Sequence, residues 1–485
     1  MYKDATILEV NEAMEKAWAA FPVYRNCSRR QRAALMRAIA EEIGALGDEL
    51  LHTAGEETHL PEARLRNERA RTIFQLTSYA DACEQGDWLD ASIDRAVPGK
   101  NPPKPDIRKM MVPLGPVVVF GAANFPFAYS TAGGDTASAL AAGCPVIVKA
   151  HPAHARTSQL MAEAIQKAVQ RCSLPEAVFT HLHGKGNEIG KALVEHPRTM
   201  AVGFTGSFAG GKQLYDWACQ RPVPIPVFAE MSSVNPVFLL PGKIKEDAAG
   251  TAAAYAGSIT LGAGQFCTNP GLLIGVDNTD LDKFAESLGA AIQQSAPGMM
   301  LHEGIYKNYQ AARSAALAQS GVETLAVSSL PAEDGQGAPT LAAVKADTFI
   351  KNPQLHREVF GPYSLLIKCK DIAEMLEVTR HLEGQLTATL MATQEDLAQQ
   401  PGLLEAVKDI CGRFIINGVP TGVEVCKSMQ HGGPFPATTD SRFGAVGADA
   451  IKRFVRPLAF QNWPHDLLPD ELKDDNPLQI RRSET

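Results

Sequence analysis

The chain has 485 residues, of which 45% are hydrophobic and 21% are charged, and its formal net charge is −8. This length is too great for one compact core and predicts two or three domains. The acidic balance argues against a nucleic-acid-binding protein, which normally carries a basic face. The sequence lacks a run of about 18 apolar residues, so it predicts no membrane span, and its first residues lack the pattern of a signal peptide.

Nine cysteines are scattered along the chain, without a CxxC pair and without histidines at zinc-binding spacing. An odd, scattered set is typical of a reducing compartment rather than of a disulfide framework. We therefore expect a cytoplasmic protein with no metal site, in which most cysteines are small core residues.

Helices dominate the first part of the chain. Residues 29–85 place apolar side chains at three- and four-residue intervals among good helix formers. A proline-rich interruption follows at residues 98–105, and "IRKMMVPLGP" after it predicts an extended hairpin arm.

Short β-branched runs alternate with helical patterns after this arm. The runs lie in "GPVVVFGAANFPF", "CPVIVKA", "AVFTHLHG", "TMAVGFTGS" and "IPVFAEM". Alternation of this length predicts an α/β fold with a doubly wound, mostly parallel sheet. A second α/β domain is expected from about residue 233, and "RFVRPLAFQNWP" predicts an edge strand that precedes a charged, partly exposed tail.

Cys267 stands apart from the other cysteines because it lies among glycines in "GAGQFCTNPG". A nucleophilic cysteine needs access, room for a substrate and donors for the oxyanion that forms. The glycines let the backbone approach a substrate, and Thr268 and Asn269 make the turn polar. The alternative is a buried structural cysteine in a glycine-rich turn, which is the commoner arrangement for an arbitrary cysteine.

Three further segments place polar groups at the ends of predicted strands. Glu230 ends the strand in "VFAEMSSVNP", where a parallel sheet places its active site and where a carboxylate suits a general base. Asn124 follows the strand in "FGAANFPF" and can donate to an oxyanion. In "VGFTGSFAGG" a strand runs into Gly206, Ser207 and Gly211 before a helix, whose first N–H groups can face a pyrophosphate. Each segment taken alone also fits an ordinary strand end or turn.

Together and in this order, these segments resemble the aldehyde dehydrogenase superfamily, and the resemblance covers nearly the whole chain. It implies that "VIVKAHPAH" supplies a lysine that contacts the cofactor ribose, and that "REVFGP" supplies residues that hold the nicotinamide ribose. The implied catalytic set is Cys267, Glu230, Asn124 and Lys149, and the implied cofactor-binding set is Lys149, Gly206, Ser207, Gly211, Glu358 and Phe360.

The resemblance also implies a mechanism. Cys267 would attack the aldehyde as a thiolate, and the oxyanion would be held by the Asn124 side chain and the Cys267 backbone N–H. Hydride transfer to the nicotinamide would leave a thioester, which water activated by Glu230 would release as the acid.

For the fold, the resemblance implies a cofactor-binding domain, a catalytic domain and a small oligomerisation arm. We expect the cofactor-binding domain at residues 1–97 and 116–232 and the catalytic domain at residues 233–452. The arm and tail would occupy residues 98–115 and 453–485 and would join identical chains into a homodimer or homotetramer.

NADP is the preferred cofactor and NAD is the alternative. Members of the family that use NAD usually carry a glutamate three residues after the lysine, where this chain has Pro152. Without that carboxylate, nothing at this position repels a 2′-phosphate. Lys185 and Arg156 are candidate phosphate partners, although each also fits a solvated surface charge.

Two positions depart from the family pattern. Glu230 is followed by Met231, Ser232 and Ser233 instead of the usual Leu-Gly-Gly, which could restrict the backbone beside the base. Ala123 stands where many relatives have tryptophan, which could open the substrate tunnel.

Longer stretches of the sequence, such as "GAGQFCTNPG" and "TTDSRFGAVG", resemble most the branch of the family that contains 2,5-dioxopentanoate (α-ketoglutaric semialdehyde) dehydrogenases. This small-molecule substrate carries a carboxylate and needs a cationic end to its pocket. Arg442 in "TTDSRFGAVG" is a candidate contact, with a structural salt bridge as the alternative. A long apolar pocket would favour a long-chain fatty aldehyde instead. A non-catalytic structural relative and an acylating reductase that transfers the thioester to CoA or phosphate are the remaining alternatives.

Overall fold

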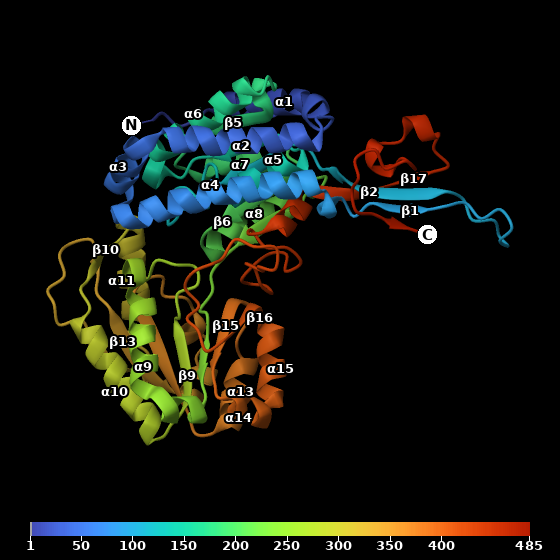
Figure 1. The fold of residues 1–485 in the computed structure, drawn as a ribbon. Helices are drawn as coiled ribbons and strands as arrows, with labels where there is room; N and C mark the ends of the chain where they lie inside the picture. Colours follow the sequence, from blue (N-terminus) through green and yellow to red (C-terminus); the bar gives the residue numbers. More distant parts are fainter. Residues whose placement is uncertain (1) are drawn as a thin grey trace.

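Two large β-sheets, each covered by helices on both faces, build most of the molecule, and a four-stranded arm projects from one side (Figure 1). The computed structural model describes residues 2–485. This arrangement confirms the predicted α/β fold with two doubly wound domains and a small arm.

The first sheet has five parallel strands. In sheet order they are β5 (Phe179–Leu182), β4 (Val146–Lys149), β3 (Val117–Phe120), β6 (Ala201–Thr205) and β7 (Val227–Glu230). The strands form where the β-branched runs are buried on both faces. Because chain order reverses between β3 and β6, the carboxyl ends of these two neighbours form the crevice in which such sheets bind ligands.

Eight helices surround this sheet. They are α1 (Ile7–Tyr24), α2 (Arg29–Ala45), α3 (Gly47–Thr58), α4 (Glu62–Gln85), α5 (Gly134–Ala142), α6 (Ala155–Arg171), α7 (Asn187–Glu195) and α8 (Phe208–Gln220). Alternate residues of β3 divide between two cores, as the period of a strand requires. Val117 and Val119 pack with α2, α4, α5 and α6, whereas Val118 and Phe120 pack with α1, α7 and α8. The helical stretch predicted at residues 29–85 is therefore three helices on one face.

The second sheet has seven strands. In sheet order they are β11 (Glu323–Val327), β13 (Thr340–Lys345), β14 (Tyr363–Cys369), β9 (Leu272–Val276), β8 (Val237–Leu239), β15 (Gln385–Met391) and β16 (Cys411–Ile416). All neighbours run parallel except β11, which is antiparallel to β13. A two-stranded ribbon, β10 (Gly298–Met299) and β12 (Gln336–Gly337), lies apart from this sheet.

Helices also cover both faces of the second sheet. They are α9 (Pro241–Thr260), α10 (Thr279–Gln294), α11 (Glu303–Leu317), α12 (Ala346–Lys351), α13 (Ile372–Arg380), α14 (Gln394–Gln399) and α15 (Pro401–Ile410). Helices α9 and α10 pack against one face, and α11, α12, α13 and α15 contribute to the core on the other.

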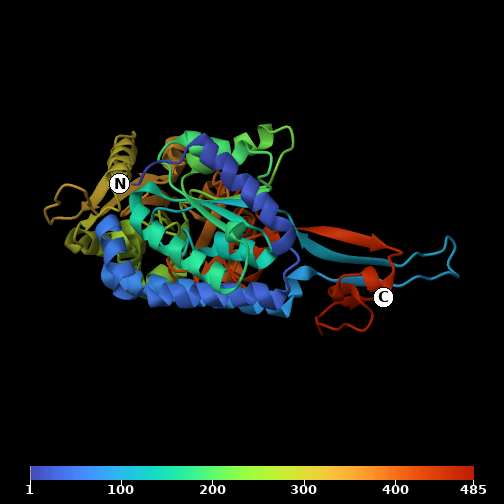
Figure 2. The ribbon, with the colours of Figure 1, turned by 90° about the horizontal axis from the view of Figure 1, so that it is seen from above.

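The arm is a four-stranded sheet that extends away from both domains, as Figures 1 and 2 show. Its strands, in order, are β17 (Val455–Gln461), β2 (Ile107–Pro113), β1 (Ser92–Asp94) and β18 (Ser483–Glu484). The predicted edge strand is β17. The sheet begins earlier than the predicted arm, at Ser92 rather than residue 98, and the tail ends in a strand that pairs with β1.

Residues 417–454, here called the return segment, connect β16 back to the first domain. Within it, the Phe435 carbonyl accepts from the Gly384 N–H at the start of β15, at 3.2 Å. Two residues further on, the Ala437 carbonyl accepts from the Met231 N–H beside β7, at 2.8 Å. The return segment therefore joins the carboxyl end of the first sheet to the second sheet.

Among residues 2–485, no helix has the length and apolar character that a membrane crossing requires. All nine cysteines are free thiols, and Cys83, Cys144 and Cys369 are buried.

Candidate active site

Cys267 lies in the turn between the short 3₁₀ helix η4 (Leu261–Gly264) and the amino end of β9, the central strand of the second sheet. The turn depends on Gly264, whose φ is +64° and whose position allows no side chain. A Cβ there would lie 2.3 Å from the carbonyl group of Gly361. The Asn235 side chain fixes the other side of the turn, because its Nδ2 donates to the carbonyl oxygens of Cys267 and Asn269, both at 2.9 Å.

Glu230 is the last residue of β7, so the first sheet supplies it. Its side chain is 4% exposed. Its Oε1 meets a buried histidine nitrogen described below, and its Oε2 has no hydrogen-bond partner within residues 2–485. A buried acceptor without a partner is costly, and active sites tolerate that cost when the group serves a substrate or a water.

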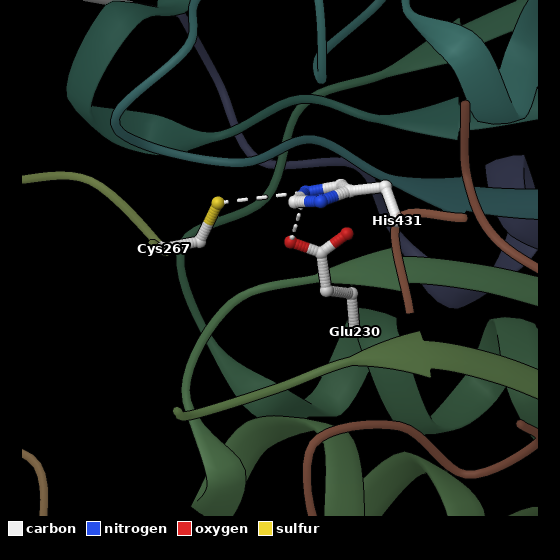
Figure 3. A group of neighbouring side chains, drawn as sticks. All are labelled: Glu230, Cys267 and His431. Atoms are coloured by element: carbon white, nitrogen blue, oxygen red, sulfur yellow. Dashed lines mark hydrogen bonds and ion pairs between the residues drawn. The ribbon is translucent and has the colours of Figure 1, made fainter. Parts of the chain in front are cut away.

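His431, in the return segment, stands between these two groups, as Figure 3 shows. Its Nε2 lies 3.5 Å from Sγ of Cys267 and 3.1 Å from Oε1 of Glu230. The imidazole is 1% exposed. The sequence analysis missed His431, because a single histidine in an irregular segment shows no periodicity, and its one signal is the pair of glycines that follows it.

The three side chains define a compact cluster with a sulfur, a nitrogen and a carboxylate donor. Their donor atoms lie within 4.8 Å of one another, close enough for a metal ion to bind all three. The expectation that the protein uses no metal stays a prediction. Both neighbours of the imidazole Nε2 are acceptors when ionised, so the tautomer with the proton on Nε2 suits them best.

Electrostatics oppose ionisation of the thiol in this state of the site. Burial raises the pKa of Cys267 well above its ordinary value, and the negative charge of Glu230 raises it further. Arg71 on α4 acts in the opposite direction and lowers the pKa of the thiol. Cationic groups near Cys267 therefore decide how much thiolate forms.

Asn124 follows β3 and reaches the same place. Its Nδ2 donates to the carbonyl oxygen of Gln265, two residues before Cys267, at 3.2 Å. Its backbone carbonyl accepts from Nη2 of Arg64 at 2.7 Å. An amide carries two N–H donors, so Asn124 can hold Gln265 and still donate to an oxyanion.

A cavity of about 440 Å³ opens beside Cys267 at the crevice between the sheets. Cys267, Glu230 and Asn124 lie at one part of its wall. The predicted cofactor residues that also line it are Gly206, Ser207, Glu358 and Phe360. Ser207 caps α8, because its side chain accepts from the Gly210 N–H.

Glu358 brings a second buried carboxyl group to this cavity. Burial raises the pKa of Glu358 to about 7, although hydrogen bonds with the Ser232 side chain and the Ser233 backbone lower it. The Ser232 hydroxyl also accepts from the Phe208 N–H at the start of α8, at 3.3 Å. Ser232 and Ser233, which replace the usual glycines, thus link the segment after β7 to Glu358 and to the start of α8.

Three predicted residues lie outside the cluster around Cys267. The Lys149 Nζ donates to the Gly184 carbonyl at 2.6 Å, near the end of β4, and burial lowers the pKa of this ammonium group. Gly211 packs against buried Met231 rather than lining the cavity. Arg442 is 75% exposed and pairs with Asp440, so the structure shows the salt bridge that was the alternative to a substrate contact.

This site, in which a cysteine, a carboxylate and an amide converge at a nucleotide-sized crevice between two α/β domains, occurs in a chain that belongs to the aldehyde dehydrogenase family. The model of that family matches residues 1–455. The resemblance seen in the sequence is therefore confirmed, and the protein is an oxidoreductase of this family.

Two curated relatives are similar over nearly the full length. "Alpha-ketoglutaric semialdehyde dehydrogenase 2" of Azospirillum brasilense is 49% identical over 98% of this chain and 90% of its own length. "Alpha-ketoglutaric semialdehyde dehydrogenase" of Acinetobacter baylyi is 44% identical over 99% of this chain and 92% of its own. A solved structure, glyceraldehyde-3-phosphate dehydrogenase GapN from Methanocaldococcus jannaschii complexed with NADP, has the same fold, with a TM-score of 0.79 at 19% identity over 95% of each chain.

Proposed function

We propose that the protein oxidises 2,5-dioxopentanoate to 2-oxoglutarate with a nicotinamide cofactor, through a thioester on Cys267. The observation that carries this proposal is the convergence of the Cys267 thiol and the Glu230 carboxylate at the edge of a 440 Å³ cavity. The substrate is supported by the two relatives, which carry the name of this semialdehyde.

In the first step, Sγ of Cys267 attacks the aldehyde carbon. Glu230, whose carboxylate lies within 4.8 Å of the sulfur, accepts the thiol proton. His431 contacts both groups through Nε2 and stabilises the negative charge that moves between them. Because burial raises the pKa of the thiol, this assistance is needed to form the thiolate.

The product of the attack is a tetrahedral thiohemiacetal whose oxyanion needs donors. The Asn124 amide and the Cys267 backbone N–H provide them, and the loss of one such donor typically costs about 3–4 kcal/mol of transition-state stabilisation. When bound, the nicotinamide ring accepts the hydride that leaves the former aldehyde carbon.

The second half of the reaction hydrolyses the thioester. Glu230 first releases the thiol proton to solvent and then removes a proton from a water molecule, which attacks the thioester carbon and displaces the Cys267 thiolate. The buried carboxylate suits this task because its Oε2 has no hydrogen-bond partner in the described chain and can accept from a water molecule.

The residues around the cavity fit a dinucleotide cofactor. Gly206 and Ser207 present the amino end of α8, a favourable place for a pyrophosphate, and the Glu358 carboxyl can accept ribose hydroxyls beside Phe360. Lys149 would bind the second ribose. Gly211 would support this site by packing α8 closely on Met231.

NADP is the cofactor that we propose first, with NAD as the alternative. Pro152 begins a short 3₁₀ helix after β4 and brings no carboxylate to the 2′-position. Arg156 gives little support as a phosphate partner, because its guanidinium is exposed and pairs with Glu56 at 3.0 Å. The preference for NADP therefore rests on Pro152, with Lys185 as the remaining candidate partner for the 2′-phosphate.

The arm supports a homodimer or homotetramer. Strand β17 is an edge of the arm sheet, and the arm stands clear of both domains (Figure 2). An open edge can pair with another chain. Light scattering on the purified protein tests this assembly. A cytoplasmic location stays a prediction from cysteine usage.

A steady-state panel tests the proposed function. It compares 2,5-dioxopentanoate, succinic semialdehyde, glutaraldehyde and a long-chain aldehyde, each with NAD and with NADP. We expect the highest kcat/KM for 2,5-dioxopentanoate and formation of the free acid. A higher kcat/KM for the long-chain aldehyde would refute the substrate, and dependence of product formation on CoA or phosphate would refute hydrolysis.

A further inference from the structure

Three arginine side chains gather around Cys267 at positions that the sequence analysis did not select. Arg64 and Arg71 lie on α4 of the first domain, and Arg413 lies on β16 of the second. None of them lines the cavity that we assign to the cofactor. They therefore approach Cys267 from another direction than the cofactor does.

Arg71 is connected to Cys267 through two aromatic rings. Its Nη2 donates to the Tyr129 hydroxyl at 3.0 Å, and its guanidinium carbon lies 5.3 Å from the centre of the Tyr129 ring. The Tyr129 ring lies 5.9 Å from the ring of His431, which contacts the Cys267 sulfur. The Nε of Arg71 is buried and has no partner among residues 2–485.

Arg64 lies seven residues, about two helical turns, before Arg71 on the same face of α4. It lies between two aromatic rings, 5.2 Å from Phe125 and 4.6 Å from Phe266, and Phe266 precedes Cys267 in the chain. Its Nη2 holds the Asn124 carbonyl, while its Nη1 is buried and has no partner in the described chain. Arg64 therefore holds the loop that carries Asn124 and is not free to bind a substrate.

Arg413 completes the group from the second sheet. Its Nη atoms donate to the carbonyl oxygens of Pro420 and Gly422, so it also orders the start of the return segment. Burial lowers the pKa of Arg413, and the nearby Cys267 and Tyr129 raise it. Its Nε likewise has no partner within residues 2–485.

The positive charge of these groups is poorly compensated. Their hydrogen bonds go to neutral oxygen atoms of Asn124, Tyr129, Pro420 and Gly422. Glu68, which is buried on α4 between Arg64 and Arg71, offsets part of this charge because its carboxylate attracts both guanidinium groups, while its Oε1 accepts from the backbone N–H groups of Phe127 and Ala128. One carboxylate leaves an excess of half-buried cations, and each of the three has a buried nitrogen without a partner in the described chain, which indicates a site for an anion.

We infer that Arg71, supported by Arg413, binds the carboxylate of the substrate and selects short aldehydes that end in an anion. This inference rests on the proposed function, and it names the residues that give that function its substrate class. Arg64 and Arg413 donate to backbone carbonyl groups, whereas Arg71 donates to the Tyr129 hydroxyl, so Arg71 can turn toward a ligand without disturbing a backbone turn.

The size of the proposed substrate agrees with this placement. Four carbon–carbon bonds separate the aldehyde carbon of 2,5-dioxopentanoate from its carboxylate carbon, which corresponds to roughly 5 Å in an extended chain. That length is comparable with the 5.9 Å between the ring of His431, which contacts the Cys267 sulfur, and the ring of Tyr129, which holds Arg71. An uncharged aldehyde would leave the guanidinium groups buried without an anion and would bind less well.

The test is a comparison of 2,5-dioxopentanoate with pentanal, which has the same number of carbons and no charge. We expect Arg71→Met to lower kcat/KM for 2,5-dioxopentanoate by about 10- to 100-fold, mostly through KM, and to lower that for pentanal much less, only through the charge that Arg71 contributes to formation of the thiolate. Arg71→Lys should recover part of the loss because it keeps the charge but not the bidentate geometry. Arg66→Met is the matched control, since Arg66 lies on the same helix but is exposed and pairs with Asp48 and Glu62.

A second measurement does not depend on turnover. Without cofactor, 2-oxoglutarate should protect Cys267 from alkylation by iodoacetamide in the unmodified protein and in Arg66→Met, and much less in Arg71→Met. Equal losses for both aldehydes, or equal protection in all variants, would overturn the role of Arg71. If the unmodified protein prefers pentanal, the proposed function fails, and the protection assay still decides whether Arg71 binds a short carboxylate.

Discussion

The imidazole of His431 lies 3.1 Å from the carboxylate of Glu230, measured from Nε2 to Oε1. The same nitrogen lies 3.5 Å from the sulfur of Cys267, so one N–H serves the nucleophile and the base. A neutral imidazole donates one proton, which means that Cys267 and Glu230 compete for it. Whichever group carries the negative charge attracts it more strongly.

Replacement of His431 tests this sharing. We expect His431→Asn to lower kcat by about 10- to 100-fold and to move the midpoint of iodoacetamide alkylation of Cys267 to higher pH, because the thiolate loses a nearby donor. The measurements are steady-state rates and a pH profile of alkylation. His381→Asn is the control, as His381 sits near Glu377 on the exposed side of α13. An unchanged alkylation profile would show that the contact is structural only.

Replacement of Glu230 separates the two halves of the reaction. Glu230→Gln should form up to one equivalent of reduced cofactor per site more slowly than the unmodified protein, because the thiol proton loses its acceptor, and should then turn over about 100-fold or more slowly still, because hydrolysis loses its base. Stopped-flow absorbance of the cofactor and mass spectrometry of the acylated Cys267 check this. Full steady-state acid production would refute Glu230 as the base. Glu195→Gln, at an exposed ion pair with Lys191, is the matched control.

Glu358 should make cofactor binding dependent on pH. Because burial raises the pKa of Glu358 to about 7, the carboxylate that accepts ribose hydroxyls forms only as the pH rises through this value. The Kd of NADP or NAD, measured by fluorescence, should therefore fall between about pH 6 and pH 8, and Glu358→Gln should remove this dependence. A Kd that is constant with pH in the unmodified protein would contradict this prediction.

The same carboxyl group also affects stability, with a definite sign. Its ordinary pKa is 4.5, so between that value and about 7 the folded protein binds more protons than the unfolded chain. The contribution of Glu358 to stability is therefore lost as the pH rises through this window. We expect Glu358→Gln to raise the Tm of the cofactor-free protein near pH 8 and to change it little near pH 4.5.

Gly211 and Met231 should be energetically coupled. A Cβ on Gly211 would lie 2.6 Å from Cγ of Met231, and Met231 is 3% exposed. Gly211→Ala should therefore cost about 1–3 kcal/mol of unfolding free energy through overpacking. In a double-mutant cycle measured by urea unfolding, Met231→Ala should absorb part of that cost. Additive effects of the two substitutions would mean that α8, which carries Gly211, moves away from Met231 as a whole.

The sequence predicts the elements that depend on local patterns. The strands β3, β4, β6 and β7 are β-branched runs, and the residues that end them face one crevice because parallel strands share a direction. This rule places Glu230 and Asn124 together, whereas Cys267 precedes β9 of the second sheet and was grouped with them only through the family resemblance. Arg442 could not be placed in this way, because its choice between a substrate and Asp440 depends on tertiary contacts.

Elements and contacts without a local pattern could not be predicted from the sequence. His431 reaches Cys267 across 164 residues of chain, from an irregular segment that carries no period. Arg71 appears in the sequence as one charged residue of an amphipathic helix, and its burial is created by the loop around Tyr129. Strand β18 is two residues long and forms only because β1 offers a free edge.

The return segment has a mechanical consequence for the whole enzyme. It is bonded to the first sheet beside Glu230 and to the second sheet at the start of β15, and it carries His431 between these bonds. A rotation of one domain against the other would therefore pivot next to the reacting atoms. Such a rotation would move Cys267, Glu230 and His431 little relative to one another, and it would move the two domains most at the end of the crevice near Lys149.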